Sequence, residues 1–260
     1  MKVLILAGGF GTRISEESQF RPKPMVSLGG KPILLHIMKL YSYYGFNEFI
    51  ILAGYKQDVI KEYFSNYFLH NSDVTFDFSE GEKKITIHNT FSEPWKVTVV
   101  DTGLNTMTGG RVKRVADFIK DEPFMLTYGD GVSNVNVREL VDFHKKHGKL
   151  VTMTAYNPGQ RFGVLDIDDK GLVREFREKT EGDGNLINIG FMVCQPAFLN
   201  YIEGDDTVLE QGPLAKAAKE GQLVAFRHYG FWKCMDTLRE KEQLETLWSS
   251  GNAPWKVWNK

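Results

Sequence analysis

The chain has 260 residues, of which 42% are hydrophobic and 25% charged, and its formal net charge is −1. This composition is typical of a globular protein with a core, and it excludes the basic field that nucleic acid or an anionic membrane would require. No apolar run approaches the roughly 20 residues that span a bilayer, and the apolar start of the chain is too short for a signal peptide. Cys194 and Cys234 lack metal-ligand spacing, so we expect them to be small core residues of a cytoplasmic protein without a zinc site.

The first predicted element is a buried strand, Val3 to Ala7, that leads directly into a glycine-rich loop. Residues 8–13 of this loop read GGFGTR, and RPKP follows at residues 21–24. Three glycines let backbone N–H groups approach phosphate oxygens, while Arg13 and Lys23 supply cations. The spacing matches neither the dinucleotide fingerprint nor the P-loop. A plain strand-to-helix turn would need the glycines but neither cation, so the stretch predicts a polyphosphate site.

Strands and helices then alternate. Residues 32–41 show the periodicity of a helix, in which we interpret His36 as structural, residues 49–54 form a second apolar strand, and residues 58–69 form a second helix. This order predicts right-handed crossovers and a parallel sheet, which binds ligands at the carboxyl ends of its strands. Residues 74–100 change to three short β-like segments separated by polar turns.

Residues 101–111, DTGLNTMTGGR, form a second candidate nucleotide loop ahead of an amphipathic helix. The N-terminus of such a helix adds partial positive charge. We predict nucleotide contacts from Gly103, Thr108, Gly110 and Arg111. An ordinary loop is the alternative, because glycine and threonine are common in turns.

Two aspartates follow apolar segments later in the chain. Asp130 lies between two glycines at the end of the predicted strand at residues 124–131, on the same sheet edge as the glycine-rich loop, and Asp236 lies in WKCMDT just before a helix. Mg²⁺ takes one or two carboxylates together with substrate phosphates, so Asp130 is well placed for it. A turn-forming role for Asp130 and an N-cap role for Asp236 are the alternatives.

The remaining elements include a helix at residues 137–147 and a hairpin at residues 161–173. In that helix we expect His144 and His147, which are flanked by lysines, to be solvated rather than to bind a metal. The last helix and the tryptophan-rich tail should cover the body of the protein or a neighbouring subunit.

Taken together, these motifs resemble those of the sugar nucleotidyltransferases. GGFGTR with PKPM, DTG with TGGR, YGDG, EK, NIG and WKCMDT occur in the order of that family over essentially the whole chain. The resemblance implies an α/β, Rossmann-like nucleotidyltransferase fold, with a mixed, mostly parallel central sheet, flanking helices and small β-hairpin additions. It also implies one domain, 1–260, whose part at about 1–130 binds the nucleotide and whose part at about 131–260 binds the sugar phosphate and makes oligomer contacts.

The resemblance assigns a role to each matching residue. The nucleotide-binding residues would be Leu6, Ala7, Gly8, Gly9, Gly11, Thr12, Arg13, Lys23, Gly103, Thr108, Gly110, Arg111 and Asp130. The sugar-phosphate-binding residues would be Tyr128, Gly163, Glu178, Lys179 and Asn188. Asp130 and Asp236 would hold Mg²⁺, and Arg13, Lys23 and Lys179 would be catalytic. Thr180 stands where the family usually has a proline.

Within the family, the chain looks like the group that makes CDP-glucose and pyrophosphate from CTP and α-D-glucose 1-phosphate, for the dideoxyhexoses of bacterial O-antigen lipopolysaccharide. The implied partners are these two small molecules and further copies of the chain in a homo-oligomer, with neither nucleic acid nor membrane. One alternative is a uridylyl- or thymidylyltransferase. Another is a non-catalytic, regulatory homologue that binds sugar nucleotides, which the presence of Lys23, Asp130, Lys179 and Asp236 disfavours.

Overall fold

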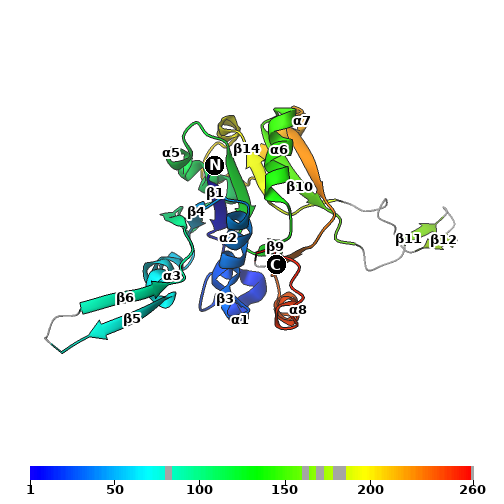
Figure 1. Ribbon diagram of the computed structural model, residues 1–260. Coiled ribbons are helices and arrows are strands. Elements are labelled where there is room, and N and C mark those ends of the chain that lie inside the picture. Colours follow the sequence, from blue (N-terminus) through cyan, green and yellow to red (C-terminus); the bar gives the residue numbers. More distant parts are fainter. Residues whose placement is uncertain (80–83, 160–163, 168–172, 178–185, 259–260) are drawn as a thin grey trace.

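The computed structural model describes residues 1–79, 84–159, 164–167, 173–177 and 186–258. A mixed sheet of eight strands runs through the body of the molecule in the order β13-β10-β14-β8-β1-β4-β7, with β15 also paired to β10 (Figure 1). Its strands are β1 (Val3–Ala7), β4 (Glu48–Ala53), β7 (Lys96–Asp101), β8 (Phe124–Tyr128), β10 (Val151–Tyr156), β13 (Ile187–Asn188), β14 (Met192–Cys194) and β15 (Leu223–His228). The β1, β4, β7 and β8 pairings and the β10–β15 pairing are parallel, whereas β13 and β14 pair antiparallel to their neighbours. The predicted mixed, mostly parallel sheet is confirmed.

The central strand β1 explains why the sheet needs helices on both faces. All five of its residues are buried. Because side chains alternate along a strand, Val3 and Ile5 join one hydrophobic cluster, while Leu4 and Leu6 join a second cluster on the other face. Each cluster also contains side chains from the helices that cover its face.

The helices on the first face are α2 (Ile33–Tyr43), α3 (Gln57–His70), α6 (Val137–His147) and α8 (Leu238–Ser249). Those on the second face are α4 (Thr108–Arg114), α5 (Ala116–Ile119), the 3₁₀ segment η4 (Pro196–Tyr201) and α7 (Pro213–Lys219). Three further short helices, η1 (Thr12–Ile14), α1 (Ser15–Ser18) and η2 (Lys23–Met25), form the loop after β1.

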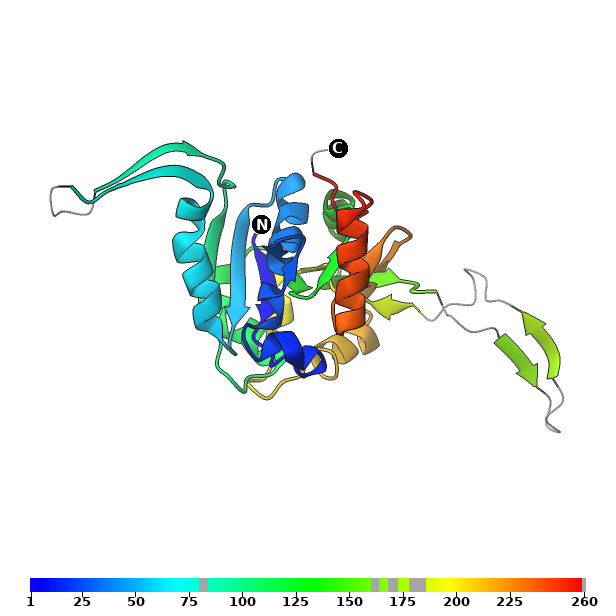
Figure 2. The ribbon, with the colours of Figure 1, turned by 90° about the horizontal axis from the view of Figure 1, so that it is seen from below.

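Four two-stranded additions complete the described structure; three join consecutive strands, as the predicted β-hairpin additions require, and the fourth pairs strands about a hundred residues apart. They are β2 (Ser27–Leu28) with β3 (Lys31–Pro32), β5 (Ser72–Asp77) with β6 (Lys84–Thr90), β9 (Gly131–Ser133) with β16 (Trp232–Cys234), and β11 (Val164–Ile167) with β12 (Val173–Arg177). The β5–β6 hairpin projects from the body in both views (Figures 1 and 2). In contrast, the β9–β16 pair lies against the body and carries the two predicted metal ligands at its end.

The expectation that His144 and His147 are solvated was wrong for His144. Its side chain is buried, where it shares hydrogen bonds of 2.8 Å with the Thr152 hydroxyl and the Gln195 amide. His147 is partly buried and bonds the same Thr152 hydroxyl. The reason is that the last turn of α6 covers β10 instead of facing water.

The tryptophan-rich tail covers the body of its own chain. Trp255 is buried, and its indole N–H donates to His36 Nδ1 at 3.2 Å. His36 Nε2 in turn bonds the Leu28 carbonyl at 2.8 Å, so this histidine is structural, as predicted. Among the described residues, no helix combines the length and the apolar character that crossing a bilayer would require.

Candidate active site

A cavity of about 620 Å³ opens where β1 and β8 end, at the carboxyl edge of the sheet. The predicted site residues that line it are Leu6, Ala7, Gly8, Gly9, Gly11, Thr12, Arg13, Lys23, Thr108, Arg111, Tyr128 and Asp130. Its other lining residues, which the sequence did not predict, are Phe10, Pro24, Leu104, Asn105, Thr106, Met107 and Gly129. Two loops that are about a hundred residues apart in the chain therefore face each other across one space.

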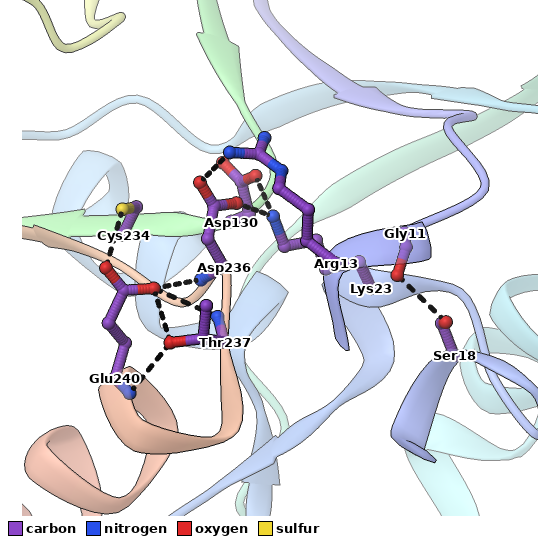
Figure 3. Close-up of polar contacts among 9 residues, drawn as sticks. All are labelled: Gly11, Arg13, Ser18, Lys23, Asp130, Cys234, Asp236, Thr237 and Glu240. Carbon is purple, nitrogen blue, oxygen red and sulfur yellow. Dashed lines mark hydrogen bonds and ion pairs between the residues drawn. The ribbon is translucent and has the colours of Figure 1, made fainter. Parts of the chain in front are cut away.

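The glycine-rich loop has the conformation and the open space that a phosphate needs. Gly11 has a φ of 68°, a left-handed conformation that side chains disfavour, and its carbonyl accepts a hydrogen bond of 2.9 Å from Ser18 Oγ (Figure 3). A Cβ atom added at Gly9 would meet nothing within 4 Å, so the backbone there is bare toward the cavity.

At one end of the cavity, two cations meet two carboxylates (Figure 3). Lys23 Nζ lies 2.6 Å from Asp130 Oδ2 and also contacts Asp236 Oδ1. The second oxygen of Asp236 lies 2.6 Å from Arg13 Nη1, and the Arg13 side chain is 72% exposed. Burial by itself would lower the pKa of Lys23, but the charges and hydrogen bonds of Asp130 and Asp236 outweigh it and raise this pKa above its ordinary value. The ammonium therefore stays protonated at neutral pH.

The β9–β16 pair explains why these carboxylates meet. Cys234 pairs with Gly131 in an antiparallel register, and Met235 N donates to the Asp130 carbonyl at 2.8 Å. Asp130 directly precedes β9 and Asp236 follows β16, so the pairing brings their side chains to the same end. Both carboxylates are within reach of one ammonium ion, the geometry that a shared cation requires.

The two carboxylates fit a hard divalent cation whose remaining ligands come from substrate and water. Two carboxylates converge on one point beside the cavity, and Mg²⁺ prefers oxygen ligands of this kind. In the part of the chain that the structure describes, no group of three or more His, Cys, Asp or Glu side chains could form a closed metal cage.

Asp236 does not serve as the N-cap of α8. That position belongs to Thr237, whose hydroxyl accepts from Glu240 N, and the Glu240 carboxylate reaches back in a capping box. Glu240 Oε2 accepts from both Asp236 N and Thr237 N at 2.9 Å, while the Cys234 thiol donates to Glu240 Oε1 at 3.8 Å (Figure 3). The start of α8 therefore holds the backbone of Asp236 and leaves its carboxylate free for Lys23 and Arg13.

Arg111 lines the cavity but is fully engaged with the loops around it. Its guanidinium donates to four carbonyls and one hydroxyl, those of Gly8, Ala53, Gly103, Leu104 and Thr102, at 2.6 to 3.3 Å. A Cβ atom at Gly8 would lie 2.2 Å from Arg111 Nη1, so glycine is needed there for close approach. Arg111 thus joins the glycine-rich loop to the loop at residues 101–107.

Gly103 and Gly110, two predicted nucleotide contacts, lie behind the cavity wall. The Gly103 carbonyl accepts from Arg111. A Cβ atom at Gly110 would lie 2.5 Å from the Asp205 carbonyl oxygen, because residues 204–210 pass directly behind α4. In the structure, glycine at 110 serves this close approach of two backbone segments.

On the predicted sugar-phosphate side, the structure joins Tyr128 to Asn188. Asn188 Nδ2 donates to the Tyr128 hydroxyl at 3.2 Å. The other predicted residues of this side, Gly163, Glu178 and Lys179, lie outside the described residues.

Two residues that contact the site, Glu240 and Glu210, were not predicted from the sequence. Glu240 has a local signal, because Thr237 and Glu240 match the capping-box spacing. Glu210 has none: its carboxylate accepts from the Thr108 hydroxyl at 2.9 Å and from the Tyr128 hydroxyl at 2.6 Å, and both donors are more than 80 residues away in the chain.

Comparisons with known proteins identify the family of the chain. The model of the nucleotidyl transferase family matches residues 2–219. The chain is 57% identical to a glucose-1-phosphate cytidylyltransferase of Salmonella typhi over 99% of its own length and 100% of that relative, and 45% identical, with the same coverage, to a probable glucose-1-phosphate cytidylyltransferase of Bacillus subtilis. The crystal structure of a putative glucose-1-phosphate thymidylyltransferase from Bacillus anthracis shares the fold, with a TM-score of 0.67 at 18% identity over 100% of this chain and 98% of that one. The chain belongs to the nucleotidyl transferase family.

Proposed function

We propose that the protein transfers the cytidylyl group of CTP to α-D-glucose 1-phosphate and forms CDP-glucose and pyrophosphate. The observation that carries this proposal is the identity of 57%, over the full length of both chains, to an enzyme named for this reaction. The site supports it, because a bare glycine loop, two cations and two carboxylates meet at one cavity.

The chemistry is an in-line displacement at the α-phosphorus of CTP. An oxygen of the sugar phosphate forms the new bond to phosphorus, and the bond to the bridging oxygen of pyrophosphate breaks. A phosphate monoester is already largely dianionic near pH 7, so the nucleophile needs no protein base. The protein must therefore hold two anions together and offset the charge on the transferring group.

The residues gathered at the cavity would divide that task among them. The Gly8–Gly11 backbone would receive the triphosphate, and Arg13 and Lys23 would exchange a carboxylate partner for phosphate oxygens. The high exposure of the Arg13 side chain, 72%, leaves it free to turn. Asp130 and Asp236 would hold Mg²⁺, which when bound would neutralise charge on the α-phosphate.

The assignment of the two halves of the chain is also a proposal. The part at about 1–130 would bind the nucleotide, and among the residues that the structure describes, those that line the cavity lie in it. The part at about 131–260 would bind the sugar phosphate through Gly163, Glu178, Lys179 and Asn188, with Lys179 steering the nucleophile. That the product serves dideoxyhexose synthesis for surface polysaccharides stays a prediction. A cytoplasmic location fits the two free cysteines.

Homo-oligomer formation is supported by the projecting β5–β6 hairpin. Phe76, Phe78, Ile85 and Phe91 on and beside it are at least half exposed, and a two-stranded hairpin is marginal in water unless something covers it. We expect light scattering after gel filtration to give a mass that is a multiple of the chain mass, and replacement of Phe76 and Phe91 by Ser to lower it. A monomeric wild type would contradict the proposal.

The reaction is tested by pyrophosphate release with glucose 1-phosphate and each of CTP, UTP, dTTP, ATP and GTP in the presence of Mg²⁺. CTP should be preferred, with CDP-glucose identified by mass spectrometry. Asp130→Asn and Asp236→Asn should each lower kcat by roughly three orders of magnitude, since they remove charge at the transferring phosphate. Asp142→Asn, on the exposed face of α6, is the matched control and should keep full activity.

Faster turnover with UTP or dTTP would replace the cytidylyl assignment with one of the alternatives. Folded protein that turns over none of the nucleotides would favour a non-catalytic homologue. Near-normal activity of Asp130→Asn would exclude its metal role.

A further inference from the structure

Glu210 joins two hydroxyl groups that line the cavity from different elements. Thr108, the first residue of α4, donates its hydroxyl hydrogen to Glu210 Oε2 at 2.9 Å. Tyr128, the last residue of β8, donates to Glu210 Oε1 at 2.6 Å. Both Thr108 and Tyr128 line the cavity, whereas Glu210 is behind them. The carboxylate therefore acts on whatever occupies the cavity through these two side chains.

The hydrogen-bond direction at both hydroxyls is determined by their partners. An ionised carboxylate can only accept, so each hydroxyl must point its one hydrogen at Glu210. The Thr108 hydroxyl also accepts from Leu209 N at 2.9 Å, and the Tyr128 hydroxyl accepts from Asn188 Nδ2 at 3.2 Å. Each oxygen then has one lone pair left and no hydrogen to offer.

The orientation of the Asn188 amide follows from a second contact. Gly190 N donates to Asn188 Oδ1 at 2.9 Å, which turns the amide NH₂ group toward Tyr128. The Tyr128 hydroxyl therefore accepts from the Asn188 amide and gives its own hydrogen to Glu210. The hydrogen bonds from Gly190 through Asn188 and Tyr128, and the one from Thr108, thus all run toward Glu210, which accepts from both sides.

The hydroxyl oxygens of Thr108 and Tyr128 form one wall of the cavity. We propose that Glu210 makes this wall a pure hydrogen-bond acceptor, so that the substrate group placed against Thr108 and Tyr128 must be a donor. Glu210 is then a positioning residue that determines specificity through its two neighbours. The proposal deepens the proposed function and rests on it. The donor has two possible sources: the amino group of cytosine, where uracil has a carbonyl oxygen, or a hydroxyl of glucose.

A purely structural role for Glu210 is the competing explanation, because residues 204–210 support α4. That support has other bonds: Met107 N donates to the Asp205 carbonyl at 2.8 Å, Gly109 N to the Thr207 carbonyl at 2.9 Å, and Arg114 pairs with the Asp205 carboxylate. Glu210→Gln leaves all of these in place. It changes only the polarity of the wall, since an amide can donate to one hydroxyl and turn that hydroxyl's hydrogen away.

The experiment compares wild type and Glu210→Gln in two arms. The first arm measures the ratio of kcat/KM for CTP to that for UTP. The second arm measures kcat/KM for glucose 1-phosphate relative to its monodeoxyfluoro analogues, in which fluorine cannot donate. Glu220→Gln is the matched control, because Glu220 accepts from the Tyr201 hydroxyl in the same way at an exposed site away from the cavity.

We expect Glu210→Gln to lower one of the two ratios about tenfold or more. A substrate donor that meets another donor instead of an acceptor loses its hydrogen bond, which lowers kcat/KM by roughly that factor. A fall in the CTP ratio identifies the cytosine amine, and a fall for one fluoro analogue identifies the matching hydroxyl. Tyr128→Phe, which removes one of the two oxygens but keeps the ring, should lower the same ratio. Glu220→Gln should lower neither.

Unchanged ratios in Glu210→Gln and Tyr128→Phe, with melting temperatures near that of wild type, would overturn the inference and leave Glu210 a structural residue. If the wild type makes no CDP-glucose, the proposed function fails by itself. Calorimetry still tests the inference about Glu210 in that case. It measures, for wild type and Glu210→Gln, the affinity for CTP relative to UTP and the affinity for glucose 1-phosphate relative to its fluoro analogues. A tenfold fall in one of these two affinity ratios supports the inference, and two unchanged ratios contradict it.

Discussion

Lys23 is the residue on which the site depends most directly. Its ammonium contacts Asp130 and Asp236 together, and its side chain is almost fully buried at the edge of the cavity. Pro22 and Pro24 flank it, and Lys23 begins the short η2 helix, so its backbone has little freedom. One cation thereby offsets the repulsion between two carboxylates that the fold has brought together.

Lys23→Met should therefore have an effect on stability as well as on turnover. Without the ammonium, the two carboxylates repel each other, and we expect the free energy of unfolding to fall by about 2 kcal/mol in the absence of divalent metal. Mg²⁺ should restore much of this loss, which thermal unfolding with EDTA or with Mg²⁺ would measure. Lys39→Met, which breaks a lysine pair with a single carboxylate, Glu93, is the control and should show no such Mg²⁺ effect. A Tm of Lys23→Met that ignores Mg²⁺ would contradict the shared-cation geometry.

Among the elements, the β9–β16 pair and the start of α8 determine where Asp236 lies. The antiparallel pairing of Cys234 with Gly131 sets the position of the chain, and the capping box of Thr237 and Glu240 then holds the backbone N–H of Asp236. A helix cap of this kind normally contributes only stability. Here it also positions a predicted metal ligand.

Glu240→Ala and Thr237→Ala should separate these two effects. Each loses part of the cap, and we expect each to lower the free energy of unfolding by about 1 kcal/mol in urea. Glu240→Ala also removes the acceptor of Asp236 N, so the Mg²⁺ concentration for half-maximal velocity should rise roughly tenfold. Mn²⁺ binding followed by electron paramagnetic resonance provides a measurement that does not depend on turnover. Equal metal dependence in the two variants would show that the cap does not position Asp236.

For the whole molecule, the C-terminal tail closes the first face of the sheet through His36. Trp255 donates to His36 Nδ1, so this nitrogen must be unprotonated, and Trp248 and Trp258 surround the ring. Burial is the main reason why the pKa of His36 falls to about 4. Burial likewise lowers the pKa of His144 to about 4.

Stability should accordingly decline as the pH falls. The unfolded chain takes up a proton at each histidine near pH 6.5, whereas the folded chain resists it until about pH 4, so below pH 6.5 the unfolded state binds more protons. Each buried histidine then contributes a slope of about 1.4 kcal/mol per pH unit between these values. Urea unfolding at pH 7, 6 and 5 should show this loss, with a smaller slope in His36→Gln. An identical slope in that variant would contradict the buried, neutral state of His36.

Much of the fold could be predicted from the sequence, because it is encoded in short windows. The apolar run of β1, the glycines after it and the periodicity of α2 each depend on a few neighbouring residues, and the structure confirms all three. The prediction for His144 failed because the sequence near the end of α6 does not show which side of this helix packs on β10.

The candidate site divides in the same way. The sequence by itself determined which chemical groups are available, namely the glycines and cations of residues 8–24, from which we predict a polyphosphate site, and the two aspartates, because these side chains have the same chemistry wherever they lie. The tertiary structure decided which of them meet. Asp130 and Asp236 share Lys23 only because β9 pairs with β16, Arg111 is taken up by carbonyls of two loops, and Glu210 reaches Thr108 and Tyr128 across the fold. These contacts join residues that are far apart in the chain, and their formation depends on the summed packing of the whole sheet, which no local stretch of sequence contains.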